Sequence, residues 1–334
     1  MTTMVNMGSS GLRVSRACLG AMMFGHQEGA PCDEAEARRI VDAFLDAGNN
    51  FVDTANGYTG GQSEEVVGRA VRSRRDSVVV ATKGRMPIGP GPNDQGLSRS
   101  YLTRALEASL RRLGTDYVDL YQCHFPDPDT PIEETMATLD GFVKAGKVRY
   151  IGCSNFTGGE IVEAQWAAAR IGGTPFVSLQ PRYSLIARQI ETDVLPTCLR
   201  QGVGTLIYSP LGGGVLTGKY RRGEEPPADS RAARNRTRPS PAAAVRNMPR
   251  NVPGSNMLDD RNLAIADEVG KVAAELGTTS TAVAIAWALG RRGVTSVIIG
   301  PRTYDQYEQN MEGFDLVLDE ASVARLNEVS RPPR

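Results

Sequence analysis

The chain has 334 residues and carries 38 basic and 38 acidic side chains, so its formal net charge is zero. A balanced charge argues against a nucleic-acid-binding protein, because such proteins normally carry a basic excess. The N-terminal segment MTTMVNMGSSGLRVSR lacks the apolar core of a signal peptide, and the apolar run at residues 282–289 is far shorter than the roughly 20 residues that cross a bilayer. With five cysteines and no CxxC pair, the chain is expected to be a cytoplasmic protein that binds neither membrane nor nucleic acid.

Short apolar runs rich in β-branched residues alternate with amphipathic patterns along the chain. Strands are predicted at residues 17–22, 51–55, 78–83, 118–125, 148–154, 176–180, 205–209 and 296–300. Helices are predicted at residues 33–47, 63–71, 98–113, 131–145, 159–171, 189–201, 260–276, 280–289 and 304–312, with Asp33 and Ser98 as N-caps. Strands that are apolar without alternation are typical of a parallel sheet covered by helices.

The eight strand–helix units favour one (β/α)8 barrel, the α/β fold also called a TIM barrel, over two doubly wound halves. No change in composition marks a domain boundary, so one barrel domain is predicted over residues 1–334. Residues 5–14, around Gly8-Ser9-Ser10-Gly11, are predicted to form an N-terminal β-hairpin at the floor of the barrel.

A long loop is predicted after the seventh strand. Residues 219–250 contain five prolines, nine basic and three acidic side chains, which leaves a net charge of +6, and they show no apolar periodicity. A loop of this length in a compact barrel is usually a lid or a disordered insert. Two interpretations stay open: a solvated tether, or a basic flap that becomes ordered over a phosphorylated ligand.

Chemically useful side chains stand at three consecutive strand ends. In a (β/α)8 barrel, catalytic groups lie at the carboxyl ends of strands and in the loops that follow them. Asp53, Lys83 and His124 take these positions after the second, third and fourth strands, and Tyr58 follows Asp53 by five residues. Each alone has an ordinary explanation, as a turn cap, a solvated strand end or a core residue. Together they indicate an active site.

The segments around these residues resemble the aldo-keto reductase superfamily. NNFVDTANGYTGGQSEEVVGRAV (49–71) is similar to the family segment that carries an Asp and a Tyr, and VVVATKG (78–84) to its lysine strand. VDLYQCHFPDPDTPIEETMATLDGFVKAGKVRYIGCSNF (118–156) resembles its His and Ser-Asn segment. IYSPLGGGVLTGKY (207–220) and VIIGPRTYDQYEQNM (297–311) resemble its cofactor segments. The fit is best to the branch that includes bacterial reductases and potassium-channel β-subunit-like proteins.

The resemblance implies an NADPH-dependent oxidoreductase that reduces a small aldehyde or ketone, with Asp53, Tyr58, Lys83 and His124 as catalytic residues. A phenol with a pKa of about 10 is a weak proton donor at neutral pH. A lysine ammonium about 4 Å away, at an effective dielectric near 20, contributes about 4 kcal/mol, or about three pKa units, to its ionisation. A buried lysine needs a carboxylate such as Asp53 to stay charged, and His124 is expected to donate a hydrogen bond to the substrate oxygen.

The cofactor segments do not contain the usual GxGxxG motif, since Gly212, Gly214 and Gly218 follow the seventh strand. By resemblance, Ser154, Asn155 and Gln180 hold the carboxamide of NADPH/NADP+, and Tyr208 stacks on the nicotinamide ring. The resemblance also places Ser209, Pro210, Leu211, Gly213 and Lys219 against the cofactor, and Gly300, Arg302, Gln306, Gln309 and Asn310 at its adenosine end. Arg302 lies just before a predicted helix, so the guanidinium and the helix N-terminus both favour an anion there. No metal site is predicted.

Two other functions remain open. A non-catalytic nucleotide-binding subunit, like the channel β-subunits of the same branch, would share the fold and the cofactor site. The presence of His124, which such relatives can lack, favours an enzyme. A Schiff-base aldolase would use the strand-end lysine as a nucleophile, but that function leaves segment 297–311 unexplained. The sequence names neither the carbonyl compound nor the oligomeric state.

Overall fold

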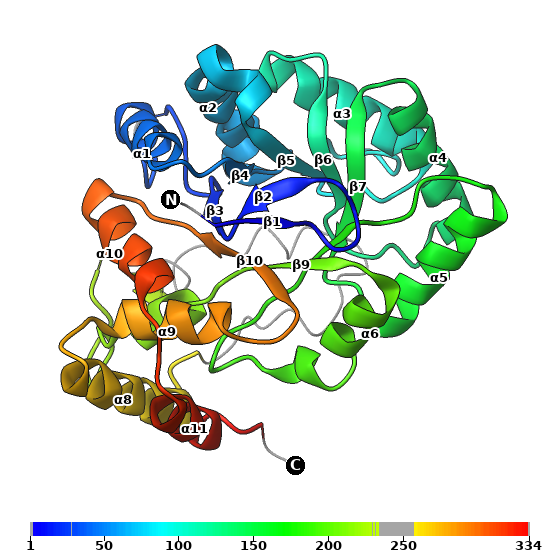
Figure 1. The fold of residues 1–334 in the computed structure, drawn as a ribbon. Helices are drawn as coiled ribbons and strands as arrows, with labels where there is room; N and C mark the ends of the chain where they lie inside the picture. Colours follow the sequence, from blue (N-terminus) through cyan, green and yellow to red (C-terminus); the bar gives the residue numbers. More distant parts are fainter. Residues whose placement is uncertain (1–2, 28, 229, 231, 234–256, 333–334) are drawn as a thin grey trace.

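The computed structural model describes residues 3–27, 29–228, 230, 232–233 and 257–332. Parallel strands form a closed barrel in the order β10-β3-β4-β5-β6-β7-β8-β9 (Figure 1). These strands are β3 (Ala17–Gly20), β4 (Phe51–Asp53), β5 (Val79–Gly84), β6 (Val118–Cys123), β7 (Val148–Ser154), β8 (Ser178–Gln180), β9 (Gly204–Ile207) and β10 (Val294–Ile299). Each overlaps a predicted strand, so the predicted (β/α)8 barrel is confirmed.

The helices surround the barrel and connect its strands (Figure 1). They are α1 (Glu34–Asp46), α2 (Gln62–Val71), α3 (Arg99–Leu113), α4 (Ile132–Lys144), α5 (Gly158–Arg170), α6 (Val194–Gln201), α8 (Asp260–Glu275), α9 (Ser280–Leu289), α10 (Tyr304–Asp315) and α11 (Glu320–Val329). The predicted caps are confirmed: Asp33 accepts the N–H of Glu36 at 2.9 Å, and Ser98 accepts that of Tyr101 at 3.3 Å.

Two helical segments differ from the prediction. Residues 189–201 split into a 3-10 turn, η3 (Gln189–Glu191), and α6, because Pro196 has no N–H to donate and is tolerated only in the first turn of a helix. Helix α11 follows an Asp319 cap but was not predicted, since Ser322 and Leu326 are its buried residues and make a stripe too narrow to recognise.

An N-terminal hairpin closes one end of the barrel, as predicted. Strands β1 (Met4–Asn6) and β2 (Arg13–Ser15) pair antiparallel, and the hairpin lies across the barrel end in Figure 1. At its turn, Ser9 N–H donates to the carbonyl of Gly202 at 2.8 Å. Gly8 has a φ of +59°, and a Cβ atom there would lie 2.2 Å from the same carbonyl, so this close approach requires glycine.

The barrel interior changes from apolar to polar along the strands. Because side chains alternate across a strand, Phe51 and Asp53 share one face of β4, and Leu120 and Gln122 share one face of β6. The apolar member of each pair packs in one buried cluster with Met7 of the hairpin. The polar members come at the carboxyl ends of the strands, opposite the hairpin, and the candidate site lies there.

Helices near the C-terminus form an outer layer on one side of the barrel. Helix α9 is buried throughout, and α8 and α11 pack outside it (Figure 1). Within the described part of the chain, no single helix has both the length and the apolar character of a membrane span. Helices α8 and α9 meet these criteria only together, across a bend of 101°.

The connection from β9 to α8 contains a 3-10 turn, η4 (Gly212–Thr217). The predicted loop at residues 219–250 begins directly after it. Most of that segment, including residues 234–250, lies outside the described residues, so its interpretation as a flap or a tether stays a prediction.

Candidate active site

Asp53, Lys83 and Tyr58 form one chain of hydrogen bonds at the carboxyl end of the barrel. The Lys83 ammonium donates to Oδ2 of Asp53 at 2.5 Å, to the Thr54 carbonyl at 2.9 Å and to Oη of Tyr58 at 3.2 Å. The Lys83 side chain is completely buried, whereas Tyr58 is partly exposed. Burial favours the neutral amine, but Asp53 and Tyr58 outweigh burial and raise the pKa of Lys83. The lysine is therefore a charged donor held against the phenol.

The barrel register and a strained turn bring these three side chains together. Asp53 pairs with Ala81 in the ladder between β4 and β5, so Lys83 lies two residues further toward the carboxyl end on the same face. Tyr58 opens the 3-10 turn η1 (Tyr58–Gly61), in which Thr59 is left-handed with a φ of 45°. The Thr59 hydroxyl donates to the Phe24 carbonyl at 2.6 Å, and this bond helps hold the unfavourable backbone conformation.

His124 lies immediately after β6 and faces the tyrosine. Its ring meets that of Tyr58 edge to face at 5.6 Å between centroids and stacks on Phe125 at 5.0 Å. Burial is the main cause that lowers the pKa of His124 well below its ordinary value, and the charges of Lys83 and Arg85 add to it. The imidazole is therefore neutral at neutral pH, and a neutral imidazole offers one donor and one acceptor nitrogen.

Two amides support Asp53. The side-chain nitrogens of Gln122 and Gln180 donate to its Oδ1 at 3.2 and 2.8 Å. The sequence analysis missed Gln122, although it lies two residues before His124 on one strand and alternation therefore turns both to the same face. Oε1 of Gln122 and Nδ1 of His124 are buried and make no hydrogen bond within the described residues.

The three residues predicted at the carboxamide, and the tyrosine predicted to stack on the nicotinamide ring, lie beside His124. Ser154 donates to the Gln180 carbonyl at 2.7 Å, and Asn155 donates to the His124 carbonyl at 3.0 Å and to the Ser154 hydroxyl at 2.9 Å. The Tyr208 hydroxyl donates to Oδ1 of Asn155 at 2.9 Å. Asn155 has a φ of +63°, a conformation that asparagine adopts more readily than most residues. The structure thus brings these predicted residues into one network next to the catalytic candidates.

The glycine-rich turn after β9 holds the next group of predicted residues. Ser209 is left-handed with a φ of 57°, and after Pro210 and Leu211 the glycines 212–214 are left-handed as well. Lys219 reaches back over this turn, since a Cβ atom on Gly214 would lie 2.9 Å from its Nζ. The N–H groups of Gly212 and Gly214 donate within the turn, to the carbonyls of Ser209 and Leu211 at 2.9 Å. Because glycines let a ligand approach the backbone closely, this turn and the adjacent Lys219 ammonium could hold the pyrophosphate of a dinucleotide.

The residues predicted at the adenosine end lie at the start of α10 and directly before it. Gly300 follows β10, the Arg302 N–H donates to the side-chain oxygen of Gln306 at 3.0 Å, and Thr303 caps the helix. Gln309 is exposed and Asn310 is buried further along the same helix.

A carboxylate from another helix joins this end of the site. Oε1 of Glu36, on α1, accepts the Tyr304 N–H at 2.6 Å. Glu36 was not among the predicted site residues, because 268 positions separate it from Tyr304 and no local pattern links the two.

The pKa of the Cys32 thiol depends on the charged side chains around this end of the site. Burial, Glu36 and Asp33 raise the pKa of Cys32 to about 12, and the charge of Arg302 opposes them. Both acidic and basic side chains therefore act on Cys32 at the end of the site where the adenosine part of the cofactor is predicted.

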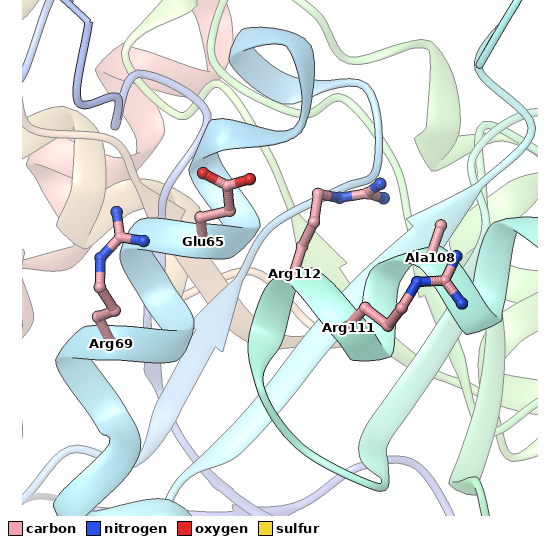
Figure 2. A pocket seen from close by; sticks show the side chains of 5 residues that line it. All are labelled: Glu65, Arg69, Ala108, Arg111 and Arg112. Carbon is pink, nitrogen blue, oxygen red and sulfur yellow. The ribbon is translucent and has the colours of Figure 1, made fainter.

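A separate cleft of about 500 Å³ lies on the outside of the barrel, between α2 and α3 (Figure 2). Its lining residues are Glu65, Arg69, Ala108, Arg111 and Arg112. Arg69 pairs with Glu34, Arg112 with Glu64, and Glu65 with His26. Because these charges are largely compensated within the protein, the cleft is a seam between two helices and has no part in the candidate site.

Comparison with known proteins identifies the family. The aldo/keto reductase family model matches residues 16–331. A probable voltage-gated potassium channel subunit beta from Arabidopsis thaliana is 38% identical over 317 residues, which cover 93% of this chain and 91% of that protein. The uncharacterized oxidoreductase YrpG of Bacillus subtilis (strain 168) is 37% identical over 338 residues, with 98% and 95% covered. A norsolorinic acid reductase of Aspergillus flavus is 32% identical over 331 residues, with 96% and 79% covered. The family and its oxidoreductase members support an oxidoreductase, and the chain belongs to the aldo/keto reductase family.

Proposed function

We propose that this protein is an NADPH-dependent reductase that converts the carbonyl of a small aldehyde or ketone to an alcohol, with Tyr58 as the general acid. One observation carries the proposal: the buried ammonium of Lys83 lies between the Asp53 carboxylate and the Tyr58 phenol. This is the arrangement that a proton donor to an alkoxide oxygen needs. The reductases among the relatives are consistent with it.

Each of the four residues has a separate task in this reaction. A bound nicotinamide supplies the hydride. Tyr58 gives its hydroxyl proton to the carbonyl oxygen as that oxygen gains negative charge. Lys83 stabilises the phenolate that remains, Asp53 keeps the lysine charged, and the neutral His124 orients the carbonyl by a hydrogen bond. Proton donation by a positioned side chain contributes typically about 10²–10⁴-fold to the rate.

We propose NADPH/NADP+ as the cofactor, bound along the carboxyl ends of β7 to β10. Support comes from the left-handed glycine turn under Lys219 and from the hydrogen-bonded group of Ser154, Asn155 and Tyr208. The Gln180 carbonyl accepts the Ser154 hydroxyl, and its side-chain amide lies at Asp53. Amide groups suit a carboxamide, which both donates and accepts hydrogen bonds. At the adenosine end, Arg302 supplies a planar fork that matches phosphate oxygens.

The direct test is oxidation of NADPH, followed by absorbance, against a panel of aldehydes and ketones with the purified protein. We expect repeated turnover with at least one class of carbonyl compound, and turnover at least about 10²-fold lower with Tyr58→Phe. Binding of NADPH without turnover on any carbonyl would favour a nucleotide-binding regulatory subunit instead. The relatives named as channel subunits are the observation that keeps this second candidate in view.

A Schiff-base aldolase is disfavoured by the state of Lys83. A lysine that attacks a carbonyl must lose its proton, whereas Asp53 and Tyr58 raise the pKa of Lys83. Borohydride in the presence of a carbonyl substrate should therefore leave no covalent adduct on this lysine.

We further propose that the protein acts in the cytoplasm on a small-molecule substrate and binds neither membrane nor nucleic acid. The free, buried cysteines of the described chain and the zero net charge support this proposal.

A further inference from the structure

The N-terminus of α10 already carries a negative charge from its own protein. The Glu36 carboxylate, on the first turn of α1, accepts the N–H of Tyr304, which is the first residue of α10. Two further N–H groups there are also engaged, because Gln306 accepts the N–H of Arg302 at 3.0 Å and Thr303 accepts the N–H of Gln306 at 3.3 Å. The helix end that would attract an anion is thus partly neutralised by a carboxylate.

One arginine, Arg39, lies against both Glu36 and Tyr304. The guanidinium of Arg39 lies 3.8 Å from the centroid of the Tyr304 ring and 3.9 Å from Oε2 of Glu36. Glu36 is partly exposed, with 28% of its side chain accessible, so it can meet a ligand arriving from solvent. Arg302 lies two residues before Tyr304, whose N–H Glu36 accepts, so both residues lie at the start of α10, where the adenosine end of the cofactor is predicted.

These two charges have opposite effects on the two cofactors. An arginine in such a place accommodates the phosphate on the adenosine ribose of NADPH, whereas an acidic side chain accepts a hydrogen bond from the free ribose hydroxyl of NADH. A carboxylate also repels the phosphate.

We propose that Glu36 is a specificity-determining residue that restrains the preference for NADPH and admits NADH as a second cofactor. This inference rests on the proposed function, since it concerns the cofactor site of the same reductase.

The test is direct titration of the protein with NADPH and with NADH, followed by quenching of its intrinsic fluorescence. The variant is Glu36→Gln, whose side-chain oxygen still accepts the Tyr304 N–H, so the start of α10 keeps its hydrogen bond. Removing the charge should tighten NADPH binding about three- to tenfold at low salt and leave NADH binding unchanged or weaker. The gain for NADPH should shrink at high salt, since exposed charges are screened.

Glu34→Gln is the matched control. Glu34 lies on the same turn of α1, but its carboxylate pairs with Arg69 on the outside of the barrel. It should leave both dissociation constants unchanged. An equal effect of Glu36→Gln on NADPH and NADH, or an equal effect of the two variants on NADPH, would overturn the inference while the reductase assignment stands. If the wild-type protein binds neither dinucleotide, the proposed function falls, and the role of Glu36 falls with it.

Discussion

Tyr58 is the residue on which the proposed chemistry depends most directly. Tyr58→Phe removes the proton and keeps the ring, so carbonyl reduction should fall by at least about 10²-fold. NADPH affinity should stay within a few-fold of the wild-type value. The Tyr58 hydroxyl accepts a hydrogen bond from Lys83, and Tyr58 is not one of the residues assigned to cofactor binding. Steady-state turnover and a fluorescence titration measure the two effects. A variant that keeps more than about a tenth of the wild-type turnover would contradict the assigned role.

Substitutions of Lys83 and of Asp53 should reduce the rate of carbonyl reduction to different extents. Lys83→Met removes the cation beside the phenol, so it should be at least as damaging as Tyr58→Phe. Asp53→Asn should be less damaging, because Lys83 still donates to Thr54 and Tyr58. The pH–rate profile of each variant measures this, and an active Lys83→Met enzyme with an unchanged alkaline limb would exclude the lysine from the mechanism.

Arg302 should bind the ribose phosphate that distinguishes NADPH from NADH. A hydrogen bond to a charged group is worth about 1.5–3 kcal/mol, which corresponds to roughly ten- to a hundredfold in affinity. Arg302→Ala should weaken NADPH binding by about that factor and leave NADH nearly unaffected. Dissociation constants for both cofactors provide the measurement, and equal losses would mean that Arg302 does not contact the phosphate.

A buried ion pair connects α2 and α3 to the barrel behind η1, the turn that carries Tyr58. Glu64 is completely buried, accepts the Thr82 hydroxyl at 2.5 Å and accepts Nε of Arg112 at 2.7 Å. Arg112→Met leaves this carboxylate buried without its cation, so the free energy of unfolding should fall by about 3–5 kcal/mol. Arg69→Met is the control, because its partner Glu34 is exposed and the cost should stay within about 1 kcal/mol.

Urea denaturation measures both costs. Adding Glu64→Gln to Arg112→Met removes the buried charge and should recover part of the loss. If Arg112→Met costs no more than Arg69→Met, the buried pair does not hold these helices to the barrel.

The stability of the whole protein should fall in mild acid because of His124. The pKa of this histidine is lowered on folding. In mild acid the unfolded chain therefore binds a proton at His124 that the folded protein does not bind. Stability from this source is complete above the ordinary histidine pKa of about 6.5 and is lost as the pH falls below it, by about 1.4 kcal/mol at pH 5.5.

His124→Gln should remove this part of the acid sensitivity. Urea denaturation at pH 7.5 and 5.5 gives the difference between variant and wild type, which separates His124 from the titrating carboxylates. His26→Gln, at the surface, is the control. An equal loss of stability in His124→Gln and wild type would show that the buried imidazole does not contribute.

Local patterns in the sequence were sufficient for the architecture and for the candidate catalytic residues at the strand ends. Strand periodicity, the Asp33 and Ser98 caps and the strand–helix order depend on neighbouring residues, so they can be recognised without a structure. Asp53, Lys83 and His124 could be identified for the same reason, since the carboxyl ends of parallel strands meet at one end of a barrel. The family segments predicted Tyr58 and the candidate cofactor-binding residues beside them.

Contacts between distant parts of the chain were decided only by the tertiary structure. Closure of the barrel turns Gln180 to Asp53, 127 positions away, and brings Glu36 of α1 to the start of α10. Neither contact leaves a periodicity or a motif, because its partners are neighbours only once the first and last strands have paired. The sequence therefore determined which elements form and which residues end the strands. The closed barrel determined which charges surround the lysine and the adenosine end of the site.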